Sequence, residues 1–225
     1  ISHFKASGRA HWGSIRAAAQ QIEKARAAGQ TVTADQYPYT ASSTALAAMV
    51  LSSAAREGSN QDLAKRLKAP AKLHKLREEI AEKLADRVAI QIASYKAKPA
   101  WSGEMVDAIA TAEGRDPVDI VVEILQNGGA SAVSFSMSED DVRYAMQLPW
   151  VATASDGAVK IDDGSKPQPR SYGTFTRKLG RDALKEKVLP IEQAVRSSSG
   201  LPADILGMKD RGYLKPGLAA DVVVF

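Results

Sequence analysis

Three strand-like runs of this chain end on side chains that can do chemistry, and this placement constrains the fold more than any other feature. The run at the N-terminus ends at His3, with Lys5 two residues on. The run from Thr31 to Tyr39 ends in a turn that contains Tyr37, and Asp156 follows the run from Trp150 to Ser155. Helix-like segments lie between the runs. Strands alternating with helices, with reactive residues at the carboxyl ends of the strands, match the rule for a (β/α)₈ barrel.

The periodicity of the remaining sequence extends this α/β pattern. We expect a first helix over 14–28, because apolar residues recur there at helical spacing. Other helices are expected over 44–55, 61–87, 102–113, 116–126, 181–187, 191–198 and 202–206, and one that Ser138 caps. Further strands are expected over 88–95, 130–137, 212–214 and 220–225. These runs supply only three or four barrel-like strands, so a closed barrel needs residues upstream of Ile1.

Composition narrows the class of protein. The chain has 44% hydrophobic and 25% charged residues, as a globular domain does, and no apolar run approaches the ~18 residues that span a bilayer. The net charge is +4, but basic and acidic residues are interspersed, as in Lys72 to Arg87, and no basic run carries aromatic residues. We therefore expect neither nucleic acid nor membrane as a partner. The absence of cysteine excludes disulfides and fits a cytoplasmic location.

His3 and Asp156 are the candidates for a metal site. A histidine at a strand end can offer a neutral imidazole to Zn²⁺, and an aspartate there can bind the ion or move a proton. Taken singly, a lone histidine is more often structural, and Asp-Gly is more often a turn. His11 and His74 lack a strand-end setting and are not expected as ligands.

Lys5 and Arg170 are the candidates for holding a carboxylate, since both are cations and arginine binds carboxylates bidentately. Arg170 is expected in a polar loop over 156–172, whose length is typical of a functional lid. Tyr37 and Tyr39 could add a hydroxyl donor. Ser43 could hydrogen-bond a substrate or cap the next helix, and its local sequence favours capping. Combined, these parts would form a metal-assisted hydrolase for a carboxylate-bearing substrate.

Considered as a set, the motifs resemble those of the N-acyl-D-amino-acid deacylases (D-aminoacylases) of the amidohydrolase superfamily, along nearly the whole chain. The matching strings are Ser2-His3-x-Lys5, Asp35-Gln36-Tyr37-Pro38-Tyr39-Thr40-Ala41-Ser42-Ser43, Ser155-Asp156-Gly157, Pro167-Gln168-Pro169-Arg170 with Tyr172-Gly173-Thr174-Phe175, and Gly212-x-Leu214-x-Pro216-Gly217-x-x-Ala220-Asp221-Val222-Val223-Val224-Phe225. Five motifs in this order are specific.

The resemblance implies an organisation of the chain. Residues 1–207 would be the C-terminal part of a TIM-like metallo-dependent hydrolase barrel, with a helical insertion over about 44–129. Residues 208–225 would return into a small β-domain.

The resemblance also implies roles for single residues. His3 would be a metal ligand, and Asp156 the catalytic aspartate beside the metal. Lys5, Tyr37, Ser43 and Arg170 would surround the substrate carboxylate. The cofactor would be one or two Zn²⁺ ions, whose remaining ligands would lie upstream of Ile1, so this segment alone is expected to be inactive.

The implied reaction is zinc-dependent hydrolysis of N-acyl-D-amino acids, which are small-molecule substrates. Two departures stand out: Gln168 replaces a histidine common in the family, and Thr176 replaces a common proline. Neither removes a group that the chemistry requires. The alternatives are another amidohydrolase activity, dihydroorotase-like or dipeptidase-like, and an inactive binding homologue. The sequence leaves the oligomeric state open.

Overall fold

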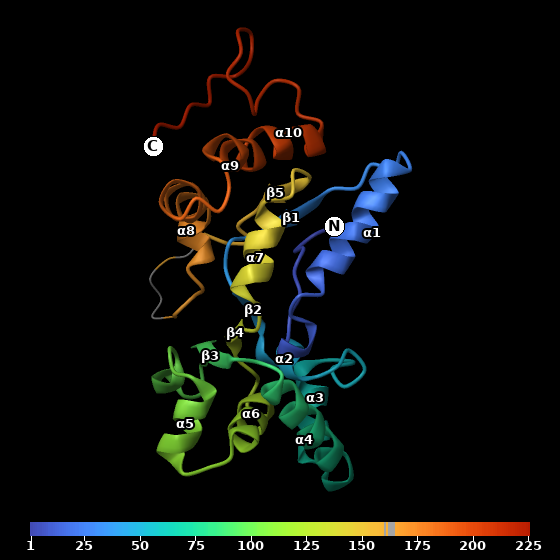
Figure 1. The fold of residues 1–225 in the computed structure, drawn as a ribbon. Coiled ribbons are helices and arrows are strands. Elements are labelled where there is room, and N and C mark those ends of the chain that lie inside the picture. The colour runs from blue at the N-terminus through green and yellow to red at the C-terminus, as the bar shows by residue number, and fades with distance from the viewer. Residues whose placement is uncertain (160, 162–164) are drawn as a thin grey trace.

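The computed structural model describes residues 1–159, 161 and 165–225, and its elements form an upper and a lower part (Figure 1). The upper part holds α1 (Ile15–Ala27), β1 (Ala34–Gln36), α7 (Glu139–Met146), β5 (Val151–Thr153), α8 (Arg170–Thr176), the π-helix η3 (Arg177–Lys185), α9 (Ile191–Ser198) and α10 (Gly200–Leu206). The lower part holds β2 (Ala41–Ala45), α2 (Leu46–Val50), α3 (Asn60–Lys68), α4 (Pro70–Ala85), β3 (Ala89–Ser94), η2 (Pro99–Trp101), α5 (Val106–Glu113), α6 (Pro117–Gln126) and β4 (Ser131–Phe135). The short helix η1 (Arg9–His11) contacts the lower part through Asp86.

Parallel strands form the centre of the upper part. β1 pairs in parallel with β5, with Ala34 opposite Val151. The segment Ile1–Phe4 runs beside β1 without forming a regular strand: Asp35 N donates to Ile1 O over 3.1 Å, and Phe4 N donates to Asp35 O over 2.8 Å. The carboxyl ends of Ile1–Phe4, β1 and β5 therefore lie on one side, as the strand-end pattern predicts.

The strand expected over 130–137 belongs to a different sheet. β4 lies between β2 and β3 and pairs antiparallel with both. The apolar content of this run predicts a barrel-like strand, but it does not reveal which strands are its partners. The helix expected from residue 44 is also partly wrong. Residues 41–45 form an edge strand against β4, since this pairing outweighs the weak local preference, and only α2 is helical.

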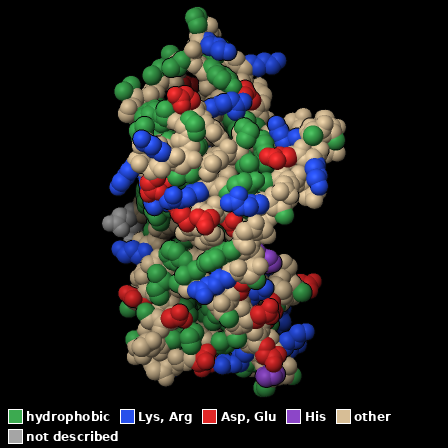
Figure 2. Space-filling model, viewed as in Figure 1, with side chains coloured by type: hydrophobic (Ala, Val, Ile, Leu, Met, Phe, Trp, Pro, Cys, Tyr) green, Lys and Arg blue, Asp and Glu red, His purple; other side chains and the backbone are tan. Residues whose placement is uncertain are grey.

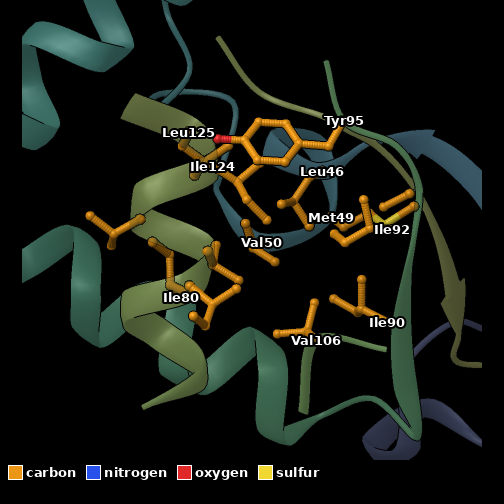
Figure 3. Packing of buried hydrophobic residues seen from close by; sticks show 14 of the residues in the cluster. Leu46, Met49, Val50, Ile80, Ile90, Ile92, Tyr95, Val106, Ile124 and Leu125 are labelled. Atoms are coloured by element: carbon orange, nitrogen blue, oxygen red, sulfur yellow. The ribbon is translucent and has the colours of Figure 1, made fainter. Parts of the chain in front are cut away.

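Helices cover one face of the antiparallel sheet and form the largest apolar cluster of the described residues. Leu46, Val50, Ile80, Ile92 and Ile124 in this cluster are fully buried (Figure 3). The helix expected over 61–87 is divided into α3 and α4, because Pro70 disfavours helical backbone at the residue before it. The other face of the sheet carries a smaller cluster of Ala41, Ala93 and Val133, with Phe135 packed against it.

Ser138 caps α7 as predicted. The Ser138 hydroxyl accepts from Asp140 N over 3.2 Å. Asp141 is buried, and its carboxylate accepts from Gly13 N over 2.9 Å. This bond fastens the loop before α1 to α7, a contact between distant segments that spacing within one helix cannot show.

The C-terminal tail differs from expectation. Residues 208–225 form turns and coil instead of the two short strands. A strand requires a partner ladder, and the described residues offer none to this tail. The domain boundaries predicted at 44, 129 and 207 stay predictions.

The surface is of mixed charge. On the face shown in Figure 2, basic and acidic side chains alternate over both parts. Among the described residues, no helix is both long and apolar enough to cross a bilayer.

Candidate functional site

The N-terminal segment places two predicted residues on one side of the chain. Phe4 and Ala6 are buried in the core of the upper part, where Phe4 packs edge-on against Trp150 with ring centroids 5.4 Å apart. His3 and Lys5 alternate with them and both reach Tyr37: the His3 ring centroid lies 6.3 Å away, and Lys5 Nζ lies 5.3 Å from the ring centroid. His3 and Lys5 therefore lie on the same side of this extended segment.

His3 and Asp156 meet at the strand ends. His3 Nε2 lies 3.0 Å from Asp156 Oδ2. Both residues have positive φ, 58° and 46°, and only Lys187 shares this among the described non-glycine residues. Such backbone costs on the order of 1–3 kcal/mol and is concentrated at functional sites. The His3 N–H donates to Asp35 Oδ1 over 2.8 Å, which holds the strained turn.

Arg170 approaches Asp156 from a third element. It is the first residue of α8, not a loop residue as expected, and its side chain is only 9% exposed. Its Nη1 lies 2.7 Å from Asp156 Oδ2, its guanidinium carbon lies 4.7 Å from the Tyr37 ring centroid, and its Nη2 donates to Ser43 O over 3.4 Å. Asp156 is thus held between a histidine and an arginine.

Tyr37 forms the floor of the site. It is 3% exposed, and His3, Lys5 and Arg170 all lie against its ring. Its hydroxyl is buried and makes no hydrogen bond of good geometry with any described residue. Burial raises the pKa of Tyr37 to about 12, although the nearby Arg170 guanidinium opposes the shift. The phenol therefore stays protonated near neutral pH and can donate to a ligand.

Lys5 provides a second cation beside the Tyr37 ring. Burial lowers its pKa, and the negative charge of Asp156 opposes this. Within the described part of the chain, no carboxylate forms a salt bridge with Lys5. Lys5 and Arg170 both face Tyr37, so the two predicted cations converge on one location.

Ser43 and Tyr39 lie differently from expectation. Ser43 is in the middle of β2 and caps no helix; its main-chain carbonyl contacts Arg170. Tyr39 lies against Arg177, whose guanidinium carbon is 4.9 Å from its ring centroid. Residues 160 and 162–164 of the expected lid loop lie outside the described residues.

Two residues near the site were not predicted from sequence as site residues. Asp35 hydrogen-bonds the backbone of His3, and Gln168 donates its amide to Ala41 O. Asp35 alternates with the buried Ala34 and Gln36, so strand periodicity alone could have placed it on the side of His3. No local signal reveals the bond of Gln168, because its partner is 127 residues away.

The metal donors present are consistent with zinc but incomplete. An imidazole nitrogen and a carboxylate oxygen are both zinc ligands, and His3 and Asp156 bring one of each together. Within the described ranges, no group of three or more histidine, aspartate or glutamate side chains could hold an ion. His11 and His74 are both exposed.

A separate apolar groove of about 970 Å³ contains none of the predicted site residues. It is lined by α9, α10 and the C-terminal tail, including Val195, Leu206, Tyr213 and Phe225. Its lining is largely apolar.

Comparison with solved structures supports the fold. The chain matches N-acyl-D-glutamate deacylase from Bordetella bronchiseptica, complexed with zinc and a phosphonate inhibitor, with a TM-score of 0.73 and 31% identity. It matches a crystal structure of D-aminoacylase with a TM-score of 0.70 and 30% identity. Each match covers 98% of this chain and 38% of the other.

Sequence comparison points the same way. All 225 residues align at 33% identity with an N-acyl-D-glutamate deacylase and with a D-aminoacylase, both from Alcaligenes xylosoxydans xylosoxydans. The chain spans 38% of the length of each of these relatives. The model of the amidohydrolase family matches residues 99–225, more than half of the chain. The chain therefore belongs to the amidohydrolase family.

Proposed function

We propose that this chain is the C-terminal portion of a zinc-dependent hydrolase that cleaves the amide bond of N-acyl-D-amino acids. The products would be a D-amino acid and a carboxylate. The observation that carries the proposal is the position of Asp156, held between His3 and Arg170 above Tyr37. A proton acceptor, a metal-type ligand and two convergent cations fit an amide substrate that bears a carboxylate.

The proposed fold is the C-terminal part of a (β/α)₈ barrel. The parallel pairing of β1 with β5, and the position of Ile1–Phe4 beside β1, support it. In such a barrel the active site lies at the carboxyl ends of the strands, which is where His3 and Asp156 lie.

His3 and Asp156 would hold the zinc, as one or two ions, together with ligands from outside this chain. When bound, zinc supplies polarisation of the amide carbonyl and a lowered pKa for water. The Asp156 carboxylate would accept the proton of the attacking water and then donate it to the nitrogen of the leaving amine. One carboxylate can serve in both steps, because the proton that it accepts from water is the proton that it later donates to the nitrogen.

Arg170, Lys5 and Tyr37 would bind the substrate carboxylate. A guanidinium has five N–H donors, so Arg170 can contact Asp156 and a substrate oxygen at once. Lys5 would add a point charge, and Tyr37 a hydrogen bond donated by its buried hydroxyl. Ser43 would contribute through β2, whose backbone contacts Arg170. Fixing the carboxylate fixes the orientation of the scissile amide.

Arg170→Met in the complete protein tests this assignment. Charge-assisted hydrogen bonds contribute roughly 1.5–3 kcal/mol each, so kcat/KM for N-acetyl-D-amino acids should fall ~10- to 100-fold more than for the corresponding amides. The amides lack the negative charge. Arg181→Met is the matched control, because Arg181 is exposed and pairs with Glu186. It should leave both rates close to wild type.

Equal losses on acid and amide substrates would contradict carboxylate recognition by Arg170. Zinc binding without turnover of any N-acyl-D-amino acid would favour the binding homologue. Turnover of cyclic amides or dipeptides in their place would favour a different amidohydrolase activity.

A further inference from the structure

We propose that Gln168 is a positioning residue that fixes Arg170 by fastening the segment 166–170 to the antiparallel sheet. The inference rests on the proposed function, because it concerns the arginine assigned to the substrate carboxylate. The lower part of the molecule would then determine where Arg170 lies, through main-chain acceptors of β2 and β3.

Alternate residues of this segment bind the sheet. Lys166 N donates to Ala93 O over 2.9 Å, the Gln168 amide donates to Ala41 O, and Arg170 donates to Ser43 O over 3.4 Å. All three acceptors are main-chain carbonyls of β2 or β3. The sheet therefore holds the segment through main-chain carbonyls and not through its side chains.

The sheet face beneath the segment allows this close approach. Ala41, Ala93 and Val133 form a cluster of small side chains there. Ala93 lies at a register shift between Ile92 and Ser94, where the β3–β4 ladder is interrupted. A carbonyl at such a bulge is available to a partner outside the ladder. Lys166 uses it.

Gln168 is the fastening point nearest to Arg170. Its neighbours Pro167 and Pro169 have no backbone N–H, so neither can donate to the sheet. Gln168 itself is 4% exposed, and its side-chain oxygen is buried with no hydrogen-bond partner among the described residues. Burying such a group is unfavourable, so its amide bond to Ala41 has to compensate.

Arg170 depends on this anchor because of where it lies. Pro169 precedes α8, so the start of the helix follows directly from the position of Gln168. The Arg170 guanidinium has to reach Asp156 within 2.7 Å and the Tyr37 ring within 4.7 Å. Arginine bonds of this kind are sensitive to displacements of about 1 Å. Loss of the hydrogen bond from Gln168 to Ala41 should allow Arg170 to shift without removing its positive charge.

A double-mutant cycle tests the inference in the complete protein. Gln168→Met keeps the volume and removes the donor. We expect it to lower kcat/KM for N-acetyl-D-amino acids ~10-fold, mainly through KM, and to lower the value for amides much less. Combined with Arg170→Met, it should add almost nothing, because a residue that acts only through Arg170 has no effect once Arg170 is gone. Gln168→Asn keeps the amide, but its side chain is shorter, so it should have the same effect as Gln168→Met. It replaces Gln168→Met in the cycle if the methionine variant does not fold.

The outcomes separate the two proposals. Multiplicative losses in the double mutant, or equal losses for acids and amides in Gln168→Met, would overturn the inference alone. If Arg170→Met by itself lowers kcat/KM equally for acids and amides, the proposal that Arg170 recognises the carboxylate is wrong. The role proposed for Gln168 is then wrong as well.

Discussion

At the scale of single residues, the site depends on charges that are close together and only partly exposed. Asp156 Oδ2 contacts both His3 and Arg170, and the side chain is 36% exposed. Its positive φ is unusual for most residues, but aspartate and asparagine both tolerate it. A change to asparagine therefore keeps the backbone and alters only the charge.

Asp156→Asn should lower kcat at least ~10²-fold, the usual scale for a positioned acid–base group, with little change in KM. Steady-state kinetics on an N-acetyl-D-amino acid measures this. Asp107→Asn, at an exposed position in α5, is the control and should leave kcat unchanged. A variant that keeps most of its kcat would exclude Asp156 as the proton acceptor.

Lys178 is a second residue whose ionisation can be tested. It is 2% exposed, and its ammonium donates to Thr153 Oγ1 over 2.7 Å. Burial lowers its pKa to about 8, although Asp182 opposes the shift. Between about pH 8 and 10 the unfolded chain keeps a proton here that the folded chain has lost. The free energy of unfolding should therefore rise with pH, by at most ~1.4 kcal/mol per unit.

Lys178→Met should remove this rise, because it removes the titrating group. Lys185→Met, at an exposed position of the same π-helix, should preserve it. Urea unfolding at several pH values in this window gives the slopes. If Lys178→Met and the wild type have the same slope, Lys178 does not titrate in this range.

At the scale of elements, the turn after β5 requires a glycine for a steric reason. A Cβ on Gly157 would lie 2.8 Å from Ser171 Cα. Gly157 therefore allows the end of β5 to contact α8 closely, and this contact brings Asp156 to Arg170.

Gly157→Ala should push α8 away and lower kcat/KM ~10-fold or more, since displacements of about 1 Å at a site are costly. Gly180→Ala is the matched control, because a Cβ there meets nothing within 4 Å. It should leave activity unchanged. Equal activity of the two variants would show that the approach of α8 to β5 does not matter for the site.

At the scale of the whole molecule, the chain contributes only part of the proposed metal centre. His3 and Asp156 provide two donors, and zinc sites commonly have three or four protein ligands. The chain spans 38% of the length of its relatives, so the remaining ligands are expected from sequence that this chain does not contain.

His3→Ala in the complete protein should lower zinc content and activity together. His74→Ala is the control, because the His74 side chain is 84% exposed and lies in α4. Elemental analysis of both purified variants measures the zinc. Full occupancy in His3→Ala would exclude His3 as a ligand.

The sequence by itself determined the α/β alternation, the helix α1 and the placement of reactive residues at strand ends. These features depend on neighbours a few residues apart, which periodicity records. His3, Lys5, Tyr37, Asp156 and Arg170 could be selected for the same reason, with the help of the family resemblance.

Only the tertiary structure decided which strands pair and what holds the site together. β4 reads like a barrel strand but joins β2 and β3, and Ser43 forms part of an edge strand and not a cap. Gln168 and Ala41 are 127 residues apart, and Asp141 and Gly13 are 128 apart. Such contacts depend on how distant segments pack, and local propensity contains no information about a partner so far along the chain.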